Sequence, residues 1–303
     1  MPTTTNDGLT LTYETQGDPS RPPILLIMGL GMQLTSWPEI FCQGLVDQGF
    51  YVIRFDNRDS GLSSKMSYLG KPNLILAYIR TILRLPVTAG YTLYDMAKDA
   101  IAVLDATGVK KAHIVGASMG GMIAQIVAGN YPDRVLSLTS IMSTSGRRGL
   151  PGPSSAARRA ILSRPSNPHD LECVVRHLMR TFRVIGSPGY PMPDDVLRAR
   201  ITASIKRNAN PAGIIRQLAA IAASGDRVTL LRELHTPTLV IHGTSDPLVP
   251  IACGRDTARL VPGAALREIE DMGHDFPPSL NDALIQMIGA HCKGQAVPEM
   301  ALR

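Results

Sequence analysis

The chain has 303 residues, of which 44% are hydrophobic and 18% are charged. This composition can bury a large core, which excludes an intrinsically disordered chain. The net charge of +6 raises the question of a nucleic-acid partner, but no basic segment carries a nucleic-acid-binding motif, so we expect no such partner.

The N-terminal segment MPTTTNDGLTLTYETQGD lacks the basic start and apolar stretch of a signal peptide. No apolar run approaches the roughly 20 residues that a membrane span needs. Four widely spaced cysteines form no CxxC pair, which favours buried thiols, although two disulfides are left open. They are Cys42, Cys173, Cys253 and Cys292. We therefore expect a cytoplasmic protein without a membrane span.

The first half of the chain alternates short strands with helices. Apolar runs and period-two alternation predict the strands, and an apolar face at helical spacing predicts the helices. The strands are expected at 9–15, 23–28, 51–55, 112–116 and 136–142, and the helices at 91–107 and 119–130. Strands separated by helices predict a parallel sheet with helices on both of its faces.

The pattern changes after residue 143, where helices follow one another without a convincing strand. An amphipathic helix covers 171–182, a loop covers 187–195, and Asn210 with Pro211 is typical of a helix start. We predict a helical cap at 146–235, inserted into a core formed by 1–145 and 236–303.

The predicted cap holds most of the positive charge. It contains 15 Lys and Arg against 6 Asp and Glu, a net charge of +9, which leaves −3 for the rest of the chain. Solvated helix faces would explain this excess, and a preference for anionic substrates or an anionic surface is the alternative.

Strand and helix alternation resumes beyond the cap. Strands are expected at 238–242 and 265–269, helices at 251–260 and 280–292, and a frayed tail from residue 293 onward. The fold class is therefore α/β, a mostly parallel, doubly wound sheet with an inserted helical cap.

A Gly-x-Ser-x-Gly sequence follows the strand at 112–116. Gly116 and Gly120 flank Ser118, where any larger side chain would collide if a strand turned directly into a helix. Such a turn would present Ser118 as a nucleophile at the end of the sheet. An ordinary helix-capping serine is the alternative.

A serine nucleophile needs a base, and the base needs a third group to orient it. Asp246 comes just after the strand at 238–242, and His274 lies in a Gly-flanked loop after the strand at 265–269. Carboxyl ends of parallel strands share one edge of a sheet, so both side chains are expected near Ser118. Asp275 is a weaker candidate for the acid, because adjacent residues rarely reach each other's side chains.

An oxyanion hole needs two hydrogen-bond donors. The backbone N–H of Met119, directly after the nucleophile, is one candidate. The second is expected in the glycine-rich loop after the strand at 23–28, where we choose the N–H of Leu30.

These motifs resemble the α/β-hydrolase fold family in its helical-cap branch. MGLGMQLTSWP, FDNRDSGLS, VGASMGGMIAQ, HGTSDPLVP and DMGHDFP stand where that family has its oxyanion loop, second strand-end turn, nucleophile elbow, acid loop and histidine loop. Within the family they are most similar to methylesterases of the aclacinomycin methylesterase kind and to bacterial carboxylesterases. Met28 departs from the His that many relatives carry before the glycine.

The resemblance implies a serine esterase without metal or organic cofactor. Ser118 would attack an ester carbonyl, His274 would act as base and then acid, and Asp246 would orient His274. The loop residues Asp56, Arg58 and Asp59 are expected to brace the site. Perhydrolase activity, C–C bond hydrolysis and a ligand receptor without turnover remain alternatives, whereas dehalogenases and epoxide hydrolases carry Asp at the nucleophile position.

Three aromatic residues, Trp37, Phe182 and Tyr190, are candidates for lining the substrate pocket, although each could equally belong to the core. The partner is expected to be a small-molecule ester. A homodimer is left open by the sequence.

Overall fold

The computed structural model describes residues 1–83 and 85–299. Within that part of the chain, eight strands form one sheet in the order β1-β2-β4-β3-β5-β6-β7-β8. Strands β3 to β8 run parallel, and β2 pairs with both β1 and β4 in antiparallel fashion. The bounds are β1 (Thr3–Asn6), β2 (Leu9–Gln16), β3 (Pro23–Ile27), β4 (Tyr51–Phe55), β5 (Ala112–Ala117), β6 (Val135–Ile141), β7 (Thr238–Gly243) and β8 (Ala265–Ile269). The predicted α/β class, with a mostly parallel sheet, is confirmed.

One strand, β1, was absent from the sequence-based prediction. It forms a hairpin with β2 in which Asn6 pairs with Leu9. The two loop residues, Asp7 and Gly8, both have positive φ, 47° and 77°. Asp-Gly between two strands is a strong hairpin signal. The signal was therefore in the sequence, in the tripeptide NDG.

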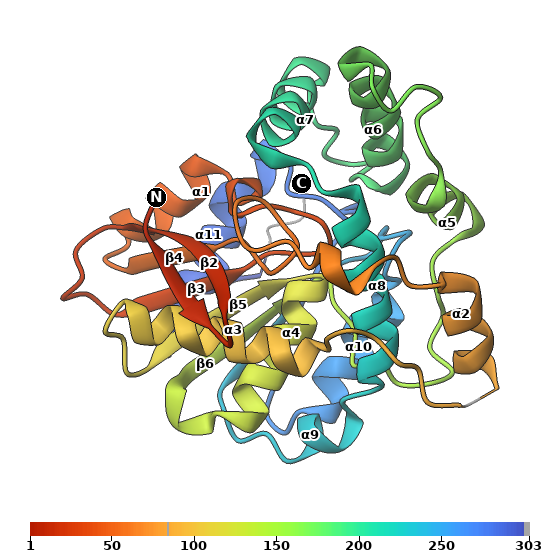
Figure 1. Cartoon of the computed structure of the whole chain (residues 1–303). Helices are drawn as coiled ribbons and strands as arrows, with labels where there is room; N and C mark the ends of the chain where they lie inside the picture. The colour runs from red at the N-terminus through yellow and green to blue at the C-terminus, as the bar shows by residue number, and fades with distance from the viewer. Residues whose placement is uncertain (84, 300–303) are drawn as a thin grey trace.

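Helices cover both faces of the sheet (Figure 1). Their bounds in the core are α1 (Glu39–Asp47), α3 (Leu93–Ala106), α4 (Met119–Asn130), α10 (Ile251–Leu260) and α11 (Asn281–Cys292). α3 and α4 pack on the face to which Leu25 and Ile27 of β3 point. α1 and α11 pack on the opposite face, to which Ile24 and Leu26 point. Because β3 is buried on both faces, it reads as a continuous apolar run.

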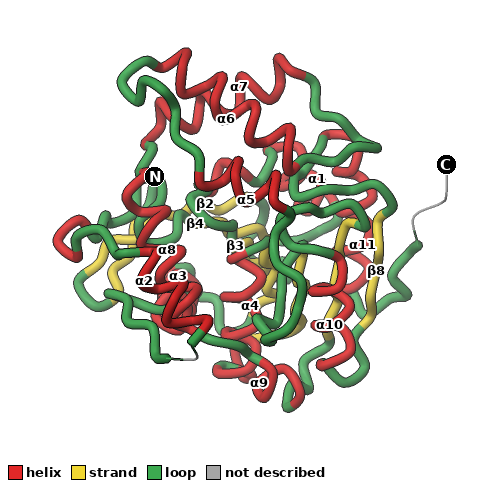
Figure 2. Tube along the Cα trace, turned by 90° about the vertical axis from the view of Figure 1, so that its right-hand side faces the viewer, coloured by secondary structure: helices red, strands yellow, loops and turns green. Residues whose placement is uncertain are grey.

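The remaining long helices interrupt the core between β6 and β7. They are α5 (Ser155–Leu162), α6 (Leu171–Ile185), α7 (Asp194–Asn208), α8 (Pro211–Ser224) and the short α9 (Val228–Arg232). Figures 1 and 2 show α6 and α7 standing above the sheet edge, with α8 below them beside the sheet. Asn210 caps α8 by accepting a hydrogen bond from the Gly213 N–H, as the sequence predicts. α9 contacts α4 and α10, so the chain has returned to the core layer there.

The segment between β4 and α3 holds a further helix that was not predicted, α2 (Leu74–Ile82), which packs against α8. Nowhere in the described residues is a helix long and apolar enough to cross a membrane.

The tail beyond α11 differs from the predicted frayed end. Val297 packs on the core cluster beneath α1 and α11. Arg267 of β8 donates hydrogen bonds to the carbonyls of Val297 and Pro298. The prediction of a frayed tail is therefore wrong for this stretch, while residues 300–303 lie outside the described residues. The four cysteines are free thiols, and Cys42, Cys173 and Cys253 are buried, as predicted.

Stability should depend on pH through a buried histidine of β5. His113 lies edge-on to Phe50, its Nδ1 is 2.8 Å from the Ser137 hydroxyl, and burial lowers its pKa to about 4. Because an unfolded histidine titrates near 6.5, this contribution to stability is complete above about pH 6.5 and is lost as the pH falls toward 4. Between pH 6.5 and pH 5 the loss is on the order of 1–2 kcal/mol.

His113→Asn should therefore lose less stability than the wild type when the pH falls from 7.5 to 5. Asparagine can still meet the Ser137 hydroxyl, but it carries no proton-binding ring. Thermal unfolding followed by circular dichroism at both pH values measures the difference. His169→Asn, at an exposed position of the cap, is the control and should keep the wild-type dependence. Equal dependence in all three proteins would contradict the assignment to His113.

Candidate active site

Ser118 occupies a strained turn between β5 and α4. Its φ of 55° and ψ of −120° lie outside the regions that L-residues ordinarily adopt. A Cβ on Gly116 would come within 2.2 Å of the Gly120 carbonyl oxygen, and one on Gly120 within 2.0 Å of the Ile27 carbonyl oxygen. Both glycines are therefore required by the close approach of backbones. Ser118 remains partly exposed, so a ligand can reach its hydroxyl.

His274 links the serine to an acid. The Nε2 atom of His274 lies 2.9 Å from Ser118 Oγ, and its Nδ1 atom lies 2.7 Å from Asp246 Oδ2. The three side chains come from the ends of β5, β7 and β8, which meet at one edge of the sheet. The residues that the sequence selected at separate strand ends thus form one hydrogen-bonded chain.

Asp246 is fixed by its own loop. Its Oδ1 atom accepts hydrogen bonds from the backbone N–H groups of Leu248 and Val249, at 2.9 and 2.8 Å. The carboxylate is buried, with its residue 5% exposed. Two backbone donors satisfy one oxygen and leave Oδ2 for the imidazole, so the acid has one orientation.

A second histidine, His242 of β7, lies close to the same carboxylate. Its Nε2 atom is 3.7 Å from Asp246 Oδ2 but only 2.7 Å from the Val249 carbonyl oxygen. Burial lowers the pKa of His242 below its usual value of 6.5, so this ring is neutral at pH 7. His242 therefore does not compete with His274 as the cation that Asp246 would stabilise.

The weaker acid candidate, Asp275, points elsewhere. Its carboxylate accepts a hydrogen bond from the hydroxyl of Ser187, just beyond cap helix α6, and burial raises its pKa. The Ser187 hydroxyl in turn accepts from the Gly273 N–H at 2.9 Å, while the His274 N–H donates to the Ile185 carbonyl at 2.7 Å. The end of α6 thus holds the backbone of the histidine loop, a role that the sequence did not reveal.

The oxyanion-loop candidate lies against the serine. A Cβ on Gly29 would be 3.1 Å from Ser118 Cβ, so this loop passes directly over the nucleophile. In the described chain, no backbone acceptor pairs with the N–H of Leu30 or Met119. Neither amide is thus paired with a backbone acceptor, as a donor of an oxyanion hole requires. Asn57 secures the loop by donating to the Met28 carbonyl at 2.8 Å.

The turn after β4 braces the site, as predicted. Asp56 accepts from the N–H groups of Leu34 and Leu62 and pairs with Arg207 of α7. Asp59 pairs with Arg216 of α8 in a buried contact. Burial alone would raise the pKa of Asp59, but hydrogen bonds led by that from Arg216 lower it.

Arg58 completes this network by pairing with Asp99 of α3, where both side chains are buried. The turn therefore ties together α3 of the core and the helices α7 and α8.

The three aromatic pocket candidates lie in different places. Trp37 has no exposed surface, stacks on Phe41 and packs at a tilt against Phe276 in the core. Phe182 packs within the small apolar cluster of α6 and α7, and Tyr190 packs on the core cluster beside α1 and α11. Both are partly buried. Trp37 thus takes part in core packing, and a pocket role for each residue stays a prediction.

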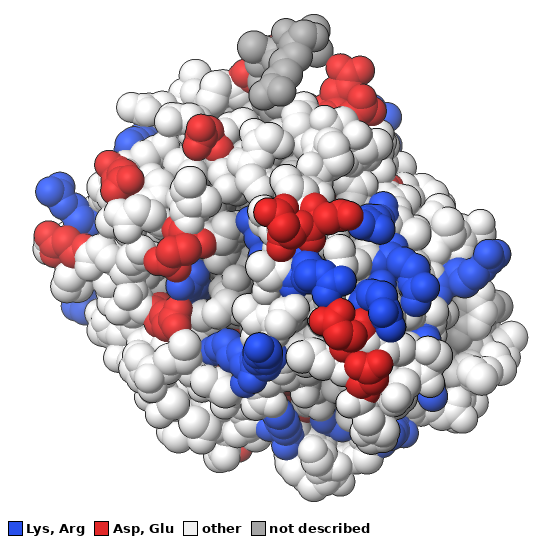
Figure 3. Space-filling model, turned by 90° about the horizontal axis from the view of Figure 1, so that it is seen from above, with Lys and Arg blue, Asp and Glu red and all other residues white. Residues whose placement is uncertain are grey.

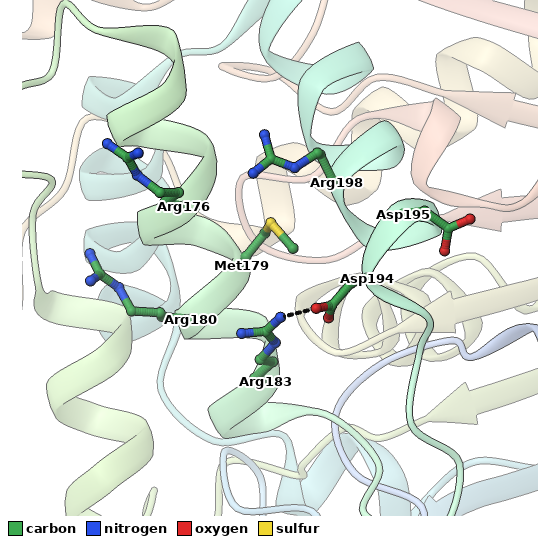
Figure 4. Close-up of a pocket in the computed structure, with 7 residues that line it drawn as sticks. All are labelled: Arg176, Met179, Arg180, Arg183, Asp194, Asp195 and Arg198. Atoms are coloured by element: carbon green, nitrogen blue, oxygen red, sulfur yellow. Dashed lines mark hydrogen bonds and ion pairs between the residues drawn. The ribbon is translucent and has the colours of Figure 1, made fainter.

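The basic side chains of residues 146–235, the predicted cap, lie partly on the surface and partly in the interior. Figure 3 shows basic side chains gathered on the upper face with acidic ones among them. A cleft of about 500 Å³ between α6 and α7 is lined by Arg176, Met179, Arg180, Arg183, Asp194, Asp195 and Arg198. In it Arg183 pairs with Asp194 (Figure 4). The arginines of this cleft lie on the solvated helix faces that were predicted. Arg216 and Arg227 are buried, so the prediction of solvated faces does not account for them.

The family model for the alpha/beta hydrolase fold matches residues 22–277. The chain belongs to the α/β-hydrolase fold family. Rhodomycin D methylesterase DnrP of Streptomyces peucetius is 32% identical to it, over 98% of this chain and 100% of that protein. This α/β-hydrolase is of the esterase type.

Solved structures show the same fold. The meta-cleavage product hydrolase CumD of Pseudomonas fluorescens IP01 has a TM-score of 0.75 at 20% identity, covering 97% of this chain and 98% of its own. An enol-lactonase of Burkholderia xenovorans LB400 has a TM-score of 0.74 at 22% identity, covering 96% and 100%. The predicted resemblance to this family is confirmed.

Proposed function

We propose that this α/β-hydrolase cleaves carboxylic esters through an acyl-enzyme on Ser118. The observation that carries the proposal is the hydrogen-bonded chain from Ser118 through His274 to Asp246, at 2.9 and 2.7 Å. Serine is a poor nucleophile at neutral pH unless a base takes its proton, and this arrangement supplies that base.

In the first half of the reaction, Ser118 Oγ attacks the ester carbonyl while His274 Nε2 takes the hydroxyl proton. The negative charge on the carbonyl oxygen is held by the N–H groups of Leu30 and Met119. His274 then gives its proton to the leaving alcohol. Asp246 keeps the imidazole in position and stabilises its cationic form.

In the second half, water attacks the acyl-enzyme. His274 Nε2 takes a proton from this water and returns it to Ser118 Oγ as the carboxylic acid leaves. Apart from the water, both halves use only side chains and backbone amides of this chain.

We propose a methyl ester as the preferred substrate, because a full-length relative is named as a methylesterase. The helices α5 to α8, within the predicted insertion at 146–235, would form the lid that selects the acid part of the ester. Phe182 and Tyr190 are the candidates in that lid for contacting it.

The test is a panel of esters offered to the purified enzyme. Methyl and ethyl esters of matched acids and p-nitrophenyl esters from acetate to decanoate are compared, with methanol and acid measured as products. Faster release of methanol than of ethanol supports the methylesterase proposal. Turnover that requires peroxide, or cleavage of a diketone without any ester hydrolysis, would overturn it in favour of perhydrolase or C–C hydrolase activity.

A further inference from the structure

The loop that carries the Leu30 amide is pressed between the nucleophile and a cap helix. Gly29 faces Ser118 on one side. On the other side, a Cβ on Gly31 would lie 2.6 Å from Ile214 Cγ1 of α8, and Gly31 itself has a φ of 67°. A side chain at position 31 would therefore collide with α8, which shows that the loop and this helix are in close contact.

One polar side chain of α8 bonds to this loop directly. Gln217, one turn after Ile214, accepts a hydrogen bond from the Gly31 N–H at 2.8 Å. Its Nε2 donates to the Arg58 carbonyl at 2.8 Å and to the Ser60 hydroxyl at 3.1 Å. Gln217 has no exposed surface, so these bonds have no water competing for them.

Gln217 thus joins the glycine loop to the turn after β4, and α8 is itself anchored there. Arg216, the residue before it, forms the buried pair with Asp59. The N-cap residue Asn210 donates to the Asp59 carbonyl. The cap helix therefore cannot slide without breaking buried polar contacts, which makes it a fixed support.

We propose that Gln217 is a positioning residue that holds the Leu30 amide where the oxyanion forms. The inference rests on the proposed ester hydrolysis. The Gly31 N–H belongs to the Leu30–Gly31 peptide, which is joined at the Leu30 Cα to the peptide that carries the Leu30 N–H. Holding the first peptide restrains the second, so a side chain of α8 helps to set the direction of the Leu30 N–H. Donors that are placed before the reaction stabilise developing charge most strongly, so misplacing one affects the transition state more than substrate binding.

Gln217→Met keeps the length of the side chain and removes its three hydrogen bonds. With p-nitrophenyl acetate we expect kcat to fall about 10- to 100-fold, because small misplacements at a reacting centre have effects of this size, while KM changes less than about threefold. Binding of a boronic acid, which forms a tetrahedral adduct on serine, should weaken in parallel. Binding of a carboxamide analogue of the substrate should not.

Gln33→Met is the matched control. Gln33 is also buried and also joins core to cap, through Ser204, Asn208 and Arg207, but its side chain does not bond to Gly31. It should keep kcat within about threefold of the wild type. If Gln217→Met folds poorly, its kcat is divided by the fraction of chains that a fluorophosphonate labels at Ser118 at completion, so that only correctly folded enzyme is compared with the wild type.

The outcomes separate this inference from the proposed function. Wild type that neither hydrolyses esters nor reacts with a fluorophosphonate at Ser118 would overturn both. An active wild type with unchanged kcat in Gln217→Met would overturn only the role of Gln217. Equal losses of kcat in Gln217→Met and Gln33→Met would also overturn the role of Gln217, since they would show that any loosened contact between these helices and the core lowers the rate.

A second inference comes from α2, whose apolar face points outward. Seven large apolar side chains in and beside this helix are between 46% and 76% exposed, and Arg80 is the one charged residue within the helix. They are Tyr68, Ile75, Leu76, Tyr78, Ile79, Leu83 and Leu85. At about 200 Å² for a fully exposed large side chain, they present on the order of 800 Å².

We infer that a second copy of this chain covers α2. A standard interface buries about 800 Å² on each partner, which is the area available here. In a two-fold symmetric dimer the same surface of each chain faces its copy on the other chain. Because this patch carries almost no charge, the two copies would not repel each other. The exposed stripe at 75, 76, 79 and 83 has the spacing by which two helices pack along their length.

Sedimentation equilibrium tests this inference. We expect twice the chain mass of 32.6 kDa for the wild type and the single mass for the variant Ile75→Ser/Tyr78→Ser/Ile79→Ser. Ile40→Ser, at a 64% exposed position of α1, should stay dimeric. A monomeric wild type would overturn the inference. So would a wild-type mass that the triple substitution leaves unchanged, or binding of the wild type to lipid vesicles that the triple substitution abolishes.

Discussion

Ser118→Ala should lower kcat for ester hydrolysis by about 10³-fold or more. The hydroxyl is the atom that would form the acyl-enzyme, and the structure places it 2.9 Å from the base. Alanine keeps the backbone of the turn and removes only the nucleophile, so the fold should be retained. Initial rates with p-nitrophenyl acetate measure the loss, and circular dichroism checks the fold.

Ser163→Ala, which removes an exposed hydroxyl at the end of α5, is the control and should keep the wild-type rate. A Ser118→Ala protein that retains more than about a tenth of wild-type kcat would contradict covalent catalysis by this residue.

Asp246→Asn should lower kcat by about 10²- to 10⁴-fold while changing KM little. The amide of asparagine can donate its NH₂ group to His274 Nδ1, which favours the tautomer that carries its proton on Nε2 and cannot accept the serine proton. The amide also has no negative charge to stabilise the imidazolium. The measurement is a comparison of kcat and KM with the same ester at pH 7.5.

Asp275→Asn is the matched comparison, because Asp275 is adjacent to the same histidine. Its carboxylate bonds to Ser187 rather than to the His274 ring, so we expect a loss of less than about tenfold from a loosened loop. A larger loss in Asp275→Asn than in Asp246→Asn would reassign the acid.

The sequence predicted the core and the hydrogen-bonded chain because both follow from local patterns. Strands such as β3 and β5 are buried on both faces and read as uninterrupted apolar runs. Ser118, Asp246 and His274 each follow a strand directly, and a parallel sheet brings such positions to one edge. The glycines at 116 and 120 marked the nucleophile turn because the backbones there leave no room for a Cβ.

The supports of the site could not be predicted in this way. Gln217 bonds to Gly31 across 186 positions of the chain, and Ser187 bonds to Gly273 across 86. No periodicity or motif relates such pairs, since they depend on how the cap is seated on the core. α2 is a different case: its apolar face would ordinarily be expected to point into the core, but Ala77 lies inward while Ile75, Leu76, Tyr78 and Ile79 lie outward.

Labelling with a fluorophosphonate followed by tryptic peptide mapping tests the central claim most directly. Ser118 is the only serine of the tryptic peptide 112–134, so the modified residue can be identified without ambiguity. We predict one label per chain, carried by this peptide and absent from Ser118→Ala. Labelling of another peptide, or equal labelling of Ser118→Ala, would contradict the assignment of Ser118 as the nucleophile.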